Sequence, residues 1–346
     1  MATPDITVMG AGVFGLSIAF ECARRGAKVR VIDETGIGAG ASGGIVGALA
    51  PHTPENWNPK KQFQYESLVL SGTFWKDVEN LSGKSTGYGR IGRIQSIESE
   101  RGLDLALKRA ETAKILWKGF ATWEVISAQS VKHKPQSSTG KVVLDTLSAR
   151  IHPKRTCESL KGALLGLGQE VTIGQAKAEG TIVWATGVQG LQALSCELAK
   201  PIGNGVKGQA LLLDLHLGDS PQLYADGVHF IPHNDGTLAI GSTTEREFTD
   251  PTTTDQQLDQ LFEKASDLFP TIKDAQILRR WAGVRPRAKS RAPILGGYPD
   301  RPGQFIANGG FKIGFGMAPK IANVMADLVL EGRDAIPEGF RVEDNL

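Results

Sequence analysis

Apolar residues near the N-terminus follow two different periods. A short run of mostly β-branched residues at 6–8 is typical of a strand, whereas residues 16–23 place apolar side chains at helical spacing until the pattern stops at Gly26. A second apolar run at 29–32 ends on Asp33. This order predicts a strand, a turn, a helix and a second strand, which is how a Rossmann-like α/β unit begins.

The remaining chain alternates between helical and strand-like patterns. Helical spacing of apolar residues predicts one or two helices at 57–82 and single helices at 101–118, 154–167, 255–269 and 320–330. Strands are predicted at 88–97, 123–131, 142–144, 170–173, 181–187, 210–213 and 277–281, with a hairpin at 228–233 and 236–241 around an Asn-Asp-Gly turn. With 346 residues, the chain is long enough for two domains with separate cores.

Composition narrows the classes of function. The 39 Lys and Arg residues nearly balance the 37 Asp and Glu residues, so the basic surface of a nucleic-acid-binding protein is not expected. The cysteines Cys22, Cys157 and Cys196 are far apart, which argues against a disulfide framework or a metal site and fits a reducing compartment. The N-terminus lacks the basic region of a signal peptide, and no apolar run reaches the roughly 18 residues of a spanning helix. We therefore expect a cytoplasmic protein with no membrane or nucleic-acid partner.

The turn after the first strand carries the pattern G-x-G-x-x-G at residues 10–15. Gly10 permits a sharp turn, Gly12 lets a pyrophosphate approach the backbone, and Gly15 lets the helix pack closely on the sheet. The N–H groups and the dipole of the helix N-terminus favour phosphate. Asp33 follows about twenty residues later, where its carboxylate can accept hydrogen bonds from ribose. The motif therefore predicts a dinucleotide site, but it does not distinguish NAD from FAD.

Four further segments complete a resemblance that covers nearly the whole chain. Residues 36–50 read GIGAGASGGIVGALA, residues 185–187 are Ala-Thr-Gly, residues 281–286 contain G-x-R-P, and residues 308–319 form another glycine-rich turn before a helix. With the first motif, this order resembles the D-amino-acid-oxidase-like family of FAD-dependent oxidoreductases. The pattern is most similar to the glycine and D-amino acid oxidases of that family.

The resemblance implies a Rossmann-like FAD-binding domain interleaved with a smaller α+β substrate domain built on a mixed or antiparallel sheet. The FAD-binding domain is expected at 1–85, 150–205 and 288–346, and the substrate-binding domain at 86–149 and 206–287. FAD should be non-covalent, because the sarcosine-oxidase branch uses a cysteine after G-x-R-P and no cysteine follows Cys196. The residues expected to hold FAD are Gly10, Gly12, Val13, Phe14, Gly15, Asp33, Glu34, Ala41, Ser42, Gly43, Gly47, Ala48, Thr186, Gly187, Gly309, Gly310, Phe311, Lys312, Ile313 and Gly314.

In the family, the arginine of G-x-R-P binds the substrate carboxylate, so the resemblance makes Arg285 the expected anchor. A guanidinium suits this role because its planar fork matches a carboxylate and remains charged. His229 or Phe230 stands at the position where related oxidases often carry tyrosine, and we take His229 as a second candidate for the catalytic site. A histidine also commonly serves only packing, so the roles of His229 and of His52 stay open.

These features lead to a hypothesis about the reaction. The enzyme would oxidise the C–N bond of a small carboxylated amine, such as glycine, a D-amino acid or an N-substituted amino acid, by hydride transfer to flavin N5. Oxygen or another electron acceptor would then reoxidise the flavin. The chemistry of the flavin does not by itself require an Asp or Glu base in the protein.

Three alternatives remain open. The first is a dehydrogenase of the same fold that passes electrons to a quinone or a protein. The second is a tRNA-modifying carboxymethylaminomethyl oxidase-like enzyme, whose loop resembles residues 41–51, although the near-neutral charge argues against tRNA. The third is a non-catalytic FAD-binding subunit. The sequence also leaves a homo-oligomer open, and it does not identify the amine, its stereochemistry or the electron acceptor.

Overall fold

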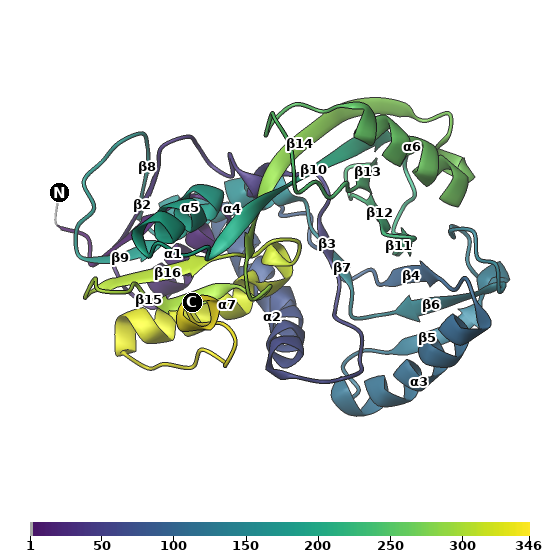
Figure 1. The fold of residues 1–346 in the computed structure, drawn as a ribbon, viewed down its shortest axis with the longest axis horizontal. Coiled ribbons are helices and arrows are strands. Elements are labelled where there is room, and N and C mark those ends of the chain that lie inside the picture. The colour runs from purple at the N-terminus through teal and green to yellow at the C-terminus, as the bar shows by residue number, and fades with distance from the viewer. Residues whose placement is uncertain (1–2) are drawn as a thin grey trace.

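Two β-sheets organise the molecule (Figure 1), and a computed structural model describes residues 3–346. The first sheet has six strands, in the spatial order β15 (Ile294–Gly297), β16 (Gln304–Asn308), β9 (Thr181–Trp184), β1 (Ile6–Met9), β2 (Val29–Asp33) and β8 (Glu170–Ile173). The strands from β16 to β8 run parallel, and β15 pairs with β16 in the antiparallel direction. This arrangement confirms the predicted Rossmann-like unit.

The helices beside the first sheet are α1 (Val13–Arg24), α2 (Pro59–Ser82), α4 (Pro153–Gly166), α5 (Gly187–Glu197) and α7 (Gly314–Glu331). The helix α1 is buried along almost its whole length, and it packs against α4 and α7. Its burial explains why nearly every residue from 13 to 23 is apolar or small. The helix α5 contacts strands of both sheets and therefore connects the two parts of the fold.

The second sheet has eight strands, in the order β14 (Gln276–Ala288), β10 (Gly203–Asp214), β13 (Thr237–Gly241), β12 (Val228–Pro232), β11 (Gln222–Ala225), β4 (Arg93–Ser96), β6 (Lys141–Asp145) and β5 (Trp123–Ser127). Its neighbouring strands run antiparallel, except that β4 and β11 are parallel. The helix α6 (Gln256–Leu268) packs on β10 and β13, and α3 (Glu100–Leu116) packs on β5. The mixed sheet confirms the predicted α+β part.

The chain passes between the two sheets several times. Strands of the first sheet come from residues 6–33, 170–184 and 294–308, and strands of the second come from residues 93–145 and 203–288. A short pair formed by β3 (Ala48–Leu49) and β7 (Ala149–Arg150) lies between them in Figure 1. The fold is therefore interleaved, as expected, whereas the domain limits at 85, 149, 205 and 287 stay a prediction.

Most predicted elements are present, and the differences have local causes. The strand predicted at 88–97 is reduced to β4, because Gly92 adopts a φ of 74° in the preceding turn. The strand predicted at 123–131 ends at Ser127, where a 3₁₀ turn begins. The last helix begins six residues before position 320, because Pro319 is accommodated inside it, where proline usually ends a helix. The strands β11, β15 and β16 and the helix α5 were not predicted.

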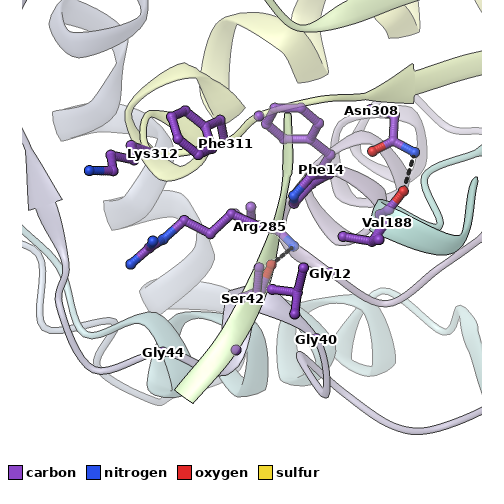
Figure 2. A pocket seen from close by; sticks show the side chains of 18 of the residues that line it. Gly12, Phe14, Gly40, Ser42, Gly44, Val188, Arg285, Asn308, Phe311 and Lys312 are labelled. Atoms are coloured by element: carbon purple, nitrogen blue, oxygen red, sulfur yellow. Dashed lines mark hydrogen bonds between the residues drawn. The ribbon is translucent and has the colours of Figure 1, made fainter. Parts of the chain in front are cut away.

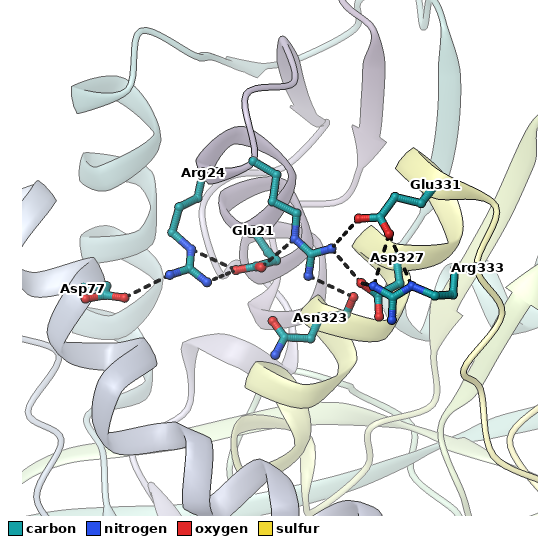
Figure 3. A network of polar contacts seen from close by, with 8 residues as sticks. Glu21, Arg24, Asp77, Asn323, Asp327, Glu331 and Arg333 are labelled. Carbon is teal, nitrogen blue, oxygen red and sulfur yellow. Dashed lines mark hydrogen bonds and ion pairs between the residues drawn. The ribbon is translucent and has the colours of Figure 1, made fainter.

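A buried glutamate connects three helices (Figure 3). Glu21 on α1 is only 2% exposed, and its carboxylate accepts hydrogen bonds from Arg24 and Arg25. Arg24 reaches Asp77 on α2 at 3.2 Å, and Arg25 reaches Asp327 on α7 at 2.7 Å. A buried carboxylate is tolerated only when it is paired, so these arginines hold α1, α2 and α7 together.

Within residues 3–346 no helix is both long and apolar enough to cross a bilayer.

This network yields a stability prediction. Replacing Glu21 by Gln should lower the free energy of unfolding by about 1–3 kcal/mol, because charge-assisted hydrogen bonds are lost from a buried site while the two arginines can return to water. Urea unfolding of the purified protein measures the change. The matched variant Asp77→Asn removes only a largely exposed pair, so it should cost less than about 1 kcal/mol. Equal losses in both variants would contradict the role of Glu21.

Candidate active site

A cleft of about 1470 Å³ opens at the carboxyl end of β1. The chain continues from β1 to β2 on one side, while β9 lies on the other, so the order of strands reverses at this point. Ligands of open α/β sheets bind where the order reverses, beyond the carboxyl ends of the strands. The volume exceeds the roughly 300–1,000 Å³ of pockets that hold one small ligand, which leaves room for a dinucleotide and a second molecule.

The three glycines of the first motif have separate steric reasons. Gly10 has a φ of 109°, and a Cβ there would lie 2.5 Å from the carbonyl oxygen of Ala185. A Cβ on Gly15 would lie 2.0 Å from the carbonyl oxygen of Gly10, so Gly15 sets the approach of α1 to the turn. Gly12 lies at the start of α1 beside Ser42, and it lines the cleft (Figure 2).

The N-terminus of α1 offers hydrogen-bond donors to the cleft. The N–H of Val13 donates to Oγ of Ser42 at 3.0 Å. The N–H groups of Gly12 and Phe14 have no hydrogen-bond partner within residues 3–346, and both residues line the cleft. Unpaired donors at the positive end of a helix dipole form an anion site. The N–H groups of Gly12 and Phe14, which we call the glycine cradle, therefore fit the pyrophosphate of a dinucleotide.

Asp33 lies beside this cradle and is held by the backbone. Its Oδ2 accepts a hydrogen bond from the N–H of Ala11 at 2.7 Å, and its Oδ1 accepts from the N–H groups of Thr35 and Gly36 at 2.9 Å. Burial alone would raise the pKa of Asp33, but the backbone donors Ala11, Gly36 and Thr35 hold this pKa below its usual value. The carboxylate is thus ionised and can accept a ribose hydroxyl. Glu34 follows on the exposed rim of the cleft.

The loop at 36–50 forms one wall. A Cβ on Gly43 would lie 2.4 Å from the carbonyl oxygen of Gly38, and a Cβ on Gly47 would lie 1.7 Å from that of Ile151, so both glycines are required by close packing. Ala41, Ser42, Gly47 and Ala48 line the cleft. The loop is also tied to the second sheet, because the ring nitrogen Nε2 of His233 lies 2.9 Å from the carbonyl oxygen of Ile45.

The opposite wall comes from α5 and from the C-terminal turn. The amide of Asn308 donates to the carbonyl oxygen of Gly187 at 2.8 Å and positions the start of α5 (Figure 2). A Cβ on Gly310 would lie 2.7 Å from the ring of Phe14, so the C-terminal turn lies directly against α1. The remaining predicted residues of this wall also line the cleft, namely Thr186, Phe311, Lys312, Ile313 and Gly314.

Arg285 projects from β14 into the cleft and is half-buried. Its Nη2 donates to Oγ of Ser242 at 2.7 Å, and its Nη1 donates to the carbonyl oxygen of Thr243 at 3.4 Å. A Cβ on Gly208 would lie 1.9 Å from Nη1, so the side chain lies across this glycine. Burial lowers the pKa of Arg285 to about 10, partly opposed by Glu245, so the group remains a cation at neutral pH. It forms no ion pair within residues 3–346.

Lys312 and His229 extend the charged region. Figure 2 shows the charged ends of Lys312 and Arg285 on the same side of the cleft. Desolvation by the surrounding protein, and then the charge of Arg285, lower the pKa of Lys312 to about 8, although its side chain is exposed. Burial, and then the charges of Arg93 and Lys312, lower the pKa of His229 to about 3. The imidazole is therefore neutral beside several cations.

The structure brings nearly all the predicted residues to one cleft. The exceptions are Gly15, Gly43 and Gly309, which do not line it. Gly309 has a φ of 77°, and a Cβ there would lie 3.0 Å from that of Ala288, so its place is also dictated by the backbone. His52 lies outside the cleft wall and hydrogen-bonds to Gln64.

Several cleft residues were not predicted from the sequence. Ser242 positions Arg285, and no local signal marked it, whereas Gly208, which lies against the guanidinium without lining the cleft, stands just before the strand predicted at 210–213. Arg93 and Gln95 alternate with apolar residues in the strand predicted at 88–97, so the polar face of that strand was a usable signal. No cysteine lines the cleft, and no group of His, Cys, Asp and Glu able to hold a metal occurs within residues 3–346.

Comparisons with known proteins agree with this geometry. The profile of a family described as FAD dependent oxidoreductase (DAO) matches residues 5–328. The chain is 28% identical to a glycine oxidase of Pseudomonas aeruginosa, over 96% of each chain. Its fold is similar to that of the crystal structure of glycine oxidase from Geobacillus kaustophilus, with a TM-score of 0.85, 21% identity and 98% of both chains covered. It is also similar to iminodiacetate oxidase from Chelativorans sp. BNC1, with a TM-score of 0.85, 20% identity and coverage of 97% and 98%.

The glycine cradle yields a prediction for cofactor retention. Replacing Gly12 by Ala should weaken flavin binding by about tenfold, because a methyl group 3.2 Å from Ser42 Oγ overpacks the surface that meets the pyrophosphate. The flavin-to-protein absorbance ratio after dialysis measures the loss. Gly72→Ala is the matched control, since Gly72 lies on an exposed face of α2 with no atom closer than 4.0 Å to the added methyl. Full flavin content in Gly12→Ala would contradict the assignment.

Proposed function

The chain belongs to the DAO family of FAD-dependent oxidoreductases, and on this premise we propose that it oxidises the C–N bond of a small amine that carries a carboxylate. FAD, held without a covalent link, is its cofactor, and members of the family act on amines or amino acids. The observation that carries the proposal is Arg285, a cation in the cleft that has no carboxylate partner within residues 3–346. Such a group calls for an anionic ligand.

In this proposal, residues from four segments hold FAD. The N–H groups of Gly12 and Phe14 bind the pyrophosphate, and the carboxylate of Asp33 accepts a ribose hydroxyl. The loop at 36–50 and the turn at 308–314 enclose the rest of the cofactor. When bound, FAD supplies the oxidation by accepting a hydride from the carbon next to the amine nitrogen.

Arg285 binds and orients the substrate in this proposal. Its guanidinium lies over Gly208, where no side chain obstructs it, and it donates to Ser242, which also lines the cleft. The nearest competing carboxylate, Glu245, is occupied elsewhere. Its Oε1 accepts a hydrogen bond from Gln209 at 3.0 Å, and its Oε2 lies 3.6 Å from Nζ of the buried Lys207. Arg285 is therefore free to pair with the substrate.

No acidic base is needed in this arrangement. Within residues 3–346, the part of the cleft wall built from the second sheet contains no Asp or Glu. A pKa of about 3 makes His229 too weak a base to deprotonate an ammonium group, so we assign it hydrogen bonding rather than proton abstraction. The amine then enters the reaction in its neutral form, and loss of hydride from a neutral amine does not require a protein base.

Anaerobic titration of the flavin spectrum tests the proposal. The purified protein should be yellow, and glycine, sarcosine or a D-amino acid should bleach its visible absorbance in the absence of oxygen. Oxygen consumption compared with dye reduction then identifies the acceptor, which separates an oxidase from a dehydrogenase. A flavin that no amine in the panel reduces would overturn the proposal and favour the non-catalytic alternative.

Arg285 yields a kinetic prediction. Arg285→Ala should raise KM for a carboxylated amine by about 100-fold, because a charge-assisted pair in a desolvated site is worth roughly 3 kcal/mol. Flavin content should stay unchanged. Steady-state kinetics test this, with Arg280→Ala as the matched control on the same strand, since Arg280 is exposed and pairs with the exposed Asp259. An unchanged KM in Arg285→Ala would remove this residue from the site.

Lys312 yields a prediction about pH. Its pKa of about 8 means that Lys312 is protonated below this pH and loses its charge above it. Binding of propionate, which stays ionised throughout, should therefore weaken by about two- to fivefold as pH rises through 8, a small effect because the side chain is exposed. Flavin absorbance titrations at several pH values measure the dissociation constant. The variant Lys312→Met should bind propionate more weakly at low pH and lose this step, and a persisting step would assign it to another group.

A further inference from the structure

One face of the second sheet carries a row of side chains into the cleft. The register pairs Gln95 with Tyr224, Tyr224 with His229, and His229 with Gly241, so these residues of β4, β11, β12 and β13 share one face. Gln95, Tyr224 and His229 all line the cleft. Beyond Gly241, on the far side of the row, lie β10 and then β14, which carries Arg285. Gln95 and Tyr224 therefore lie at the end of the row that is remote from Arg285, in a separate part of the cleft.

Arg93 completes this end of the cleft. It precedes Gln95 by two residues on β4, so both side chains point to the same face. Its side chain is buried, and its Nε donates to Oδ2 of Asp145 at 2.9 Å. Asp145 is fully buried and also accepts a hydrogen bond from the N–H of Ser148. The guanidinium centre lies 5.6 Å from the centre of the Tyr224 ring, which limits how far it can move.

The terminal amino groups of Arg93 have no hydrogen-bond partner among the described residues. Within residues 3–346 neither Nη1 nor Nη2 makes a hydrogen bond, although the residue is only 6% exposed and lines the cleft. Two neighbours also have polar atoms without a partner, since Nε2 of Gln95 and Nδ1 of His229 are buried and unpaired, whereas Nη1 and Nη2 of Arg93 keep some accessible area. Buried polar groups are nearly always hydrogen-bonded, so a guanidinium with two unpaired amino groups, beside two more cleft-lining residues that carry unpaired polar atoms, points to a ligand.

The geometry points to a second anion-binding subsite, at which Arg93, Gln95 and His229 hold an acidic group of the substrate while Arg285 holds the carboxylate next to the amine. This inference rests on the proposed function and deepens it, because it names the substrate class as amines that carry two acidic groups. A substrate with one carboxylate leaves Nε2 of Gln95 buried and unpaired and leaves the Nη groups of Arg93 with water alone, which is less favourable than a charge-assisted pair. A second carboxylate accepts from the planar edge of the Arg93 guanidinium.

The subsite is tested by comparing ligands that differ by one carboxylate. Succinate and propionate are not amines, so their effect on the flavin spectrum reports binding without turnover. Succinate should bind at least about tenfold more tightly than propionate. The same order is expected for KM of iminodiacetate against glycine and of D-aspartate against D-alanine. Equal or weaker binding of the dicarboxylates would overturn the inference.

A double variant identifies the group responsible. Arg93→Met combined with Asp145→Asn removes both buried charges together, so no buried carboxylate is left unpaired and the acceptor for Ser148 is kept. The succinate-to-propionate preference should fall to within about twofold in a protein that retains FAD and its melting temperature. A preference that persists would overturn the inference, and so would an equal loss of both ligands, because that result indicates a purely structural role.

Two further variants complete the design. Arg90→Met is the matched control, because Arg90 is an exposed arginine three residues earlier whose guanidinium lies over Phe120, and its preference should be unchanged. If the double variant does not fold, Gln95→Leu provides the test, and it should reduce the preference by about threefold.

Failure of the subsite is distinct from failure of the proposed function. A flavin reduced equally by mono- and dicarboxylated amines rejects only the subsite, whereas a flavin reduced by no amine rejects the proposed function.

Discussion

The close approach of Gly10 to the carbonyl of Ala185 is the constraint on which the rest of the structure depends. It lets β1 and β9 lie side by side at the point where the chain turns into α1, and Gly15 then brings α1 against the same turn. Any side chain at either glycine would separate these elements. The free N–H groups of the cradle and the hydrogen bond from Ala11 to Asp33 exist because the turn is this tight.

The second sheet contributes the charges of Arg285 and Arg93 to the cleft, and the turn at 308–314 contributes that of Lys312. Arg285, Lys312 and Arg93 all reach the cleft, and only Arg93 forms an ion pair within residues 3–346. Glu245 could neutralise Arg285, but Gln209 and Lys207 hold this carboxylate within their own buried network. The cleft therefore keeps a positive region next to a neutral imidazole, which favours anionic ligands and disfavours a histidine base.

The interleaved chain explains why the glycine cradle of the first sheet and the cationic region meet in one cleft. The loop that carries Ser42 is held to the hairpin by His233, and α5 contacts strands of both sheets. The C-terminal turn lies against Phe14 on one side and joins β14 through the bond from the N–H of Phe311 to the carbonyl oxygen of Pro286. Because each wall is anchored in both sheets, the cradle and the cationic region are fixed relative to one another.

The sequence by itself determined the local parts of this protein. The glycine turn, α1 and Asp33 follow from residue spacing within one short segment, and Arg285 was found through a local motif and its resemblance to a family. Only the tertiary structure decided that Arg93 pairs with Asp145, 52 residues away, and that Arg285 lies across Gly208. The tertiary structure also decided that β15 pairs with β16 and that burial and neighbouring charges lower the pKa of His229. Strand pairing, burial and the field of neighbouring charges arise between distant segments, so no local pattern encodes them.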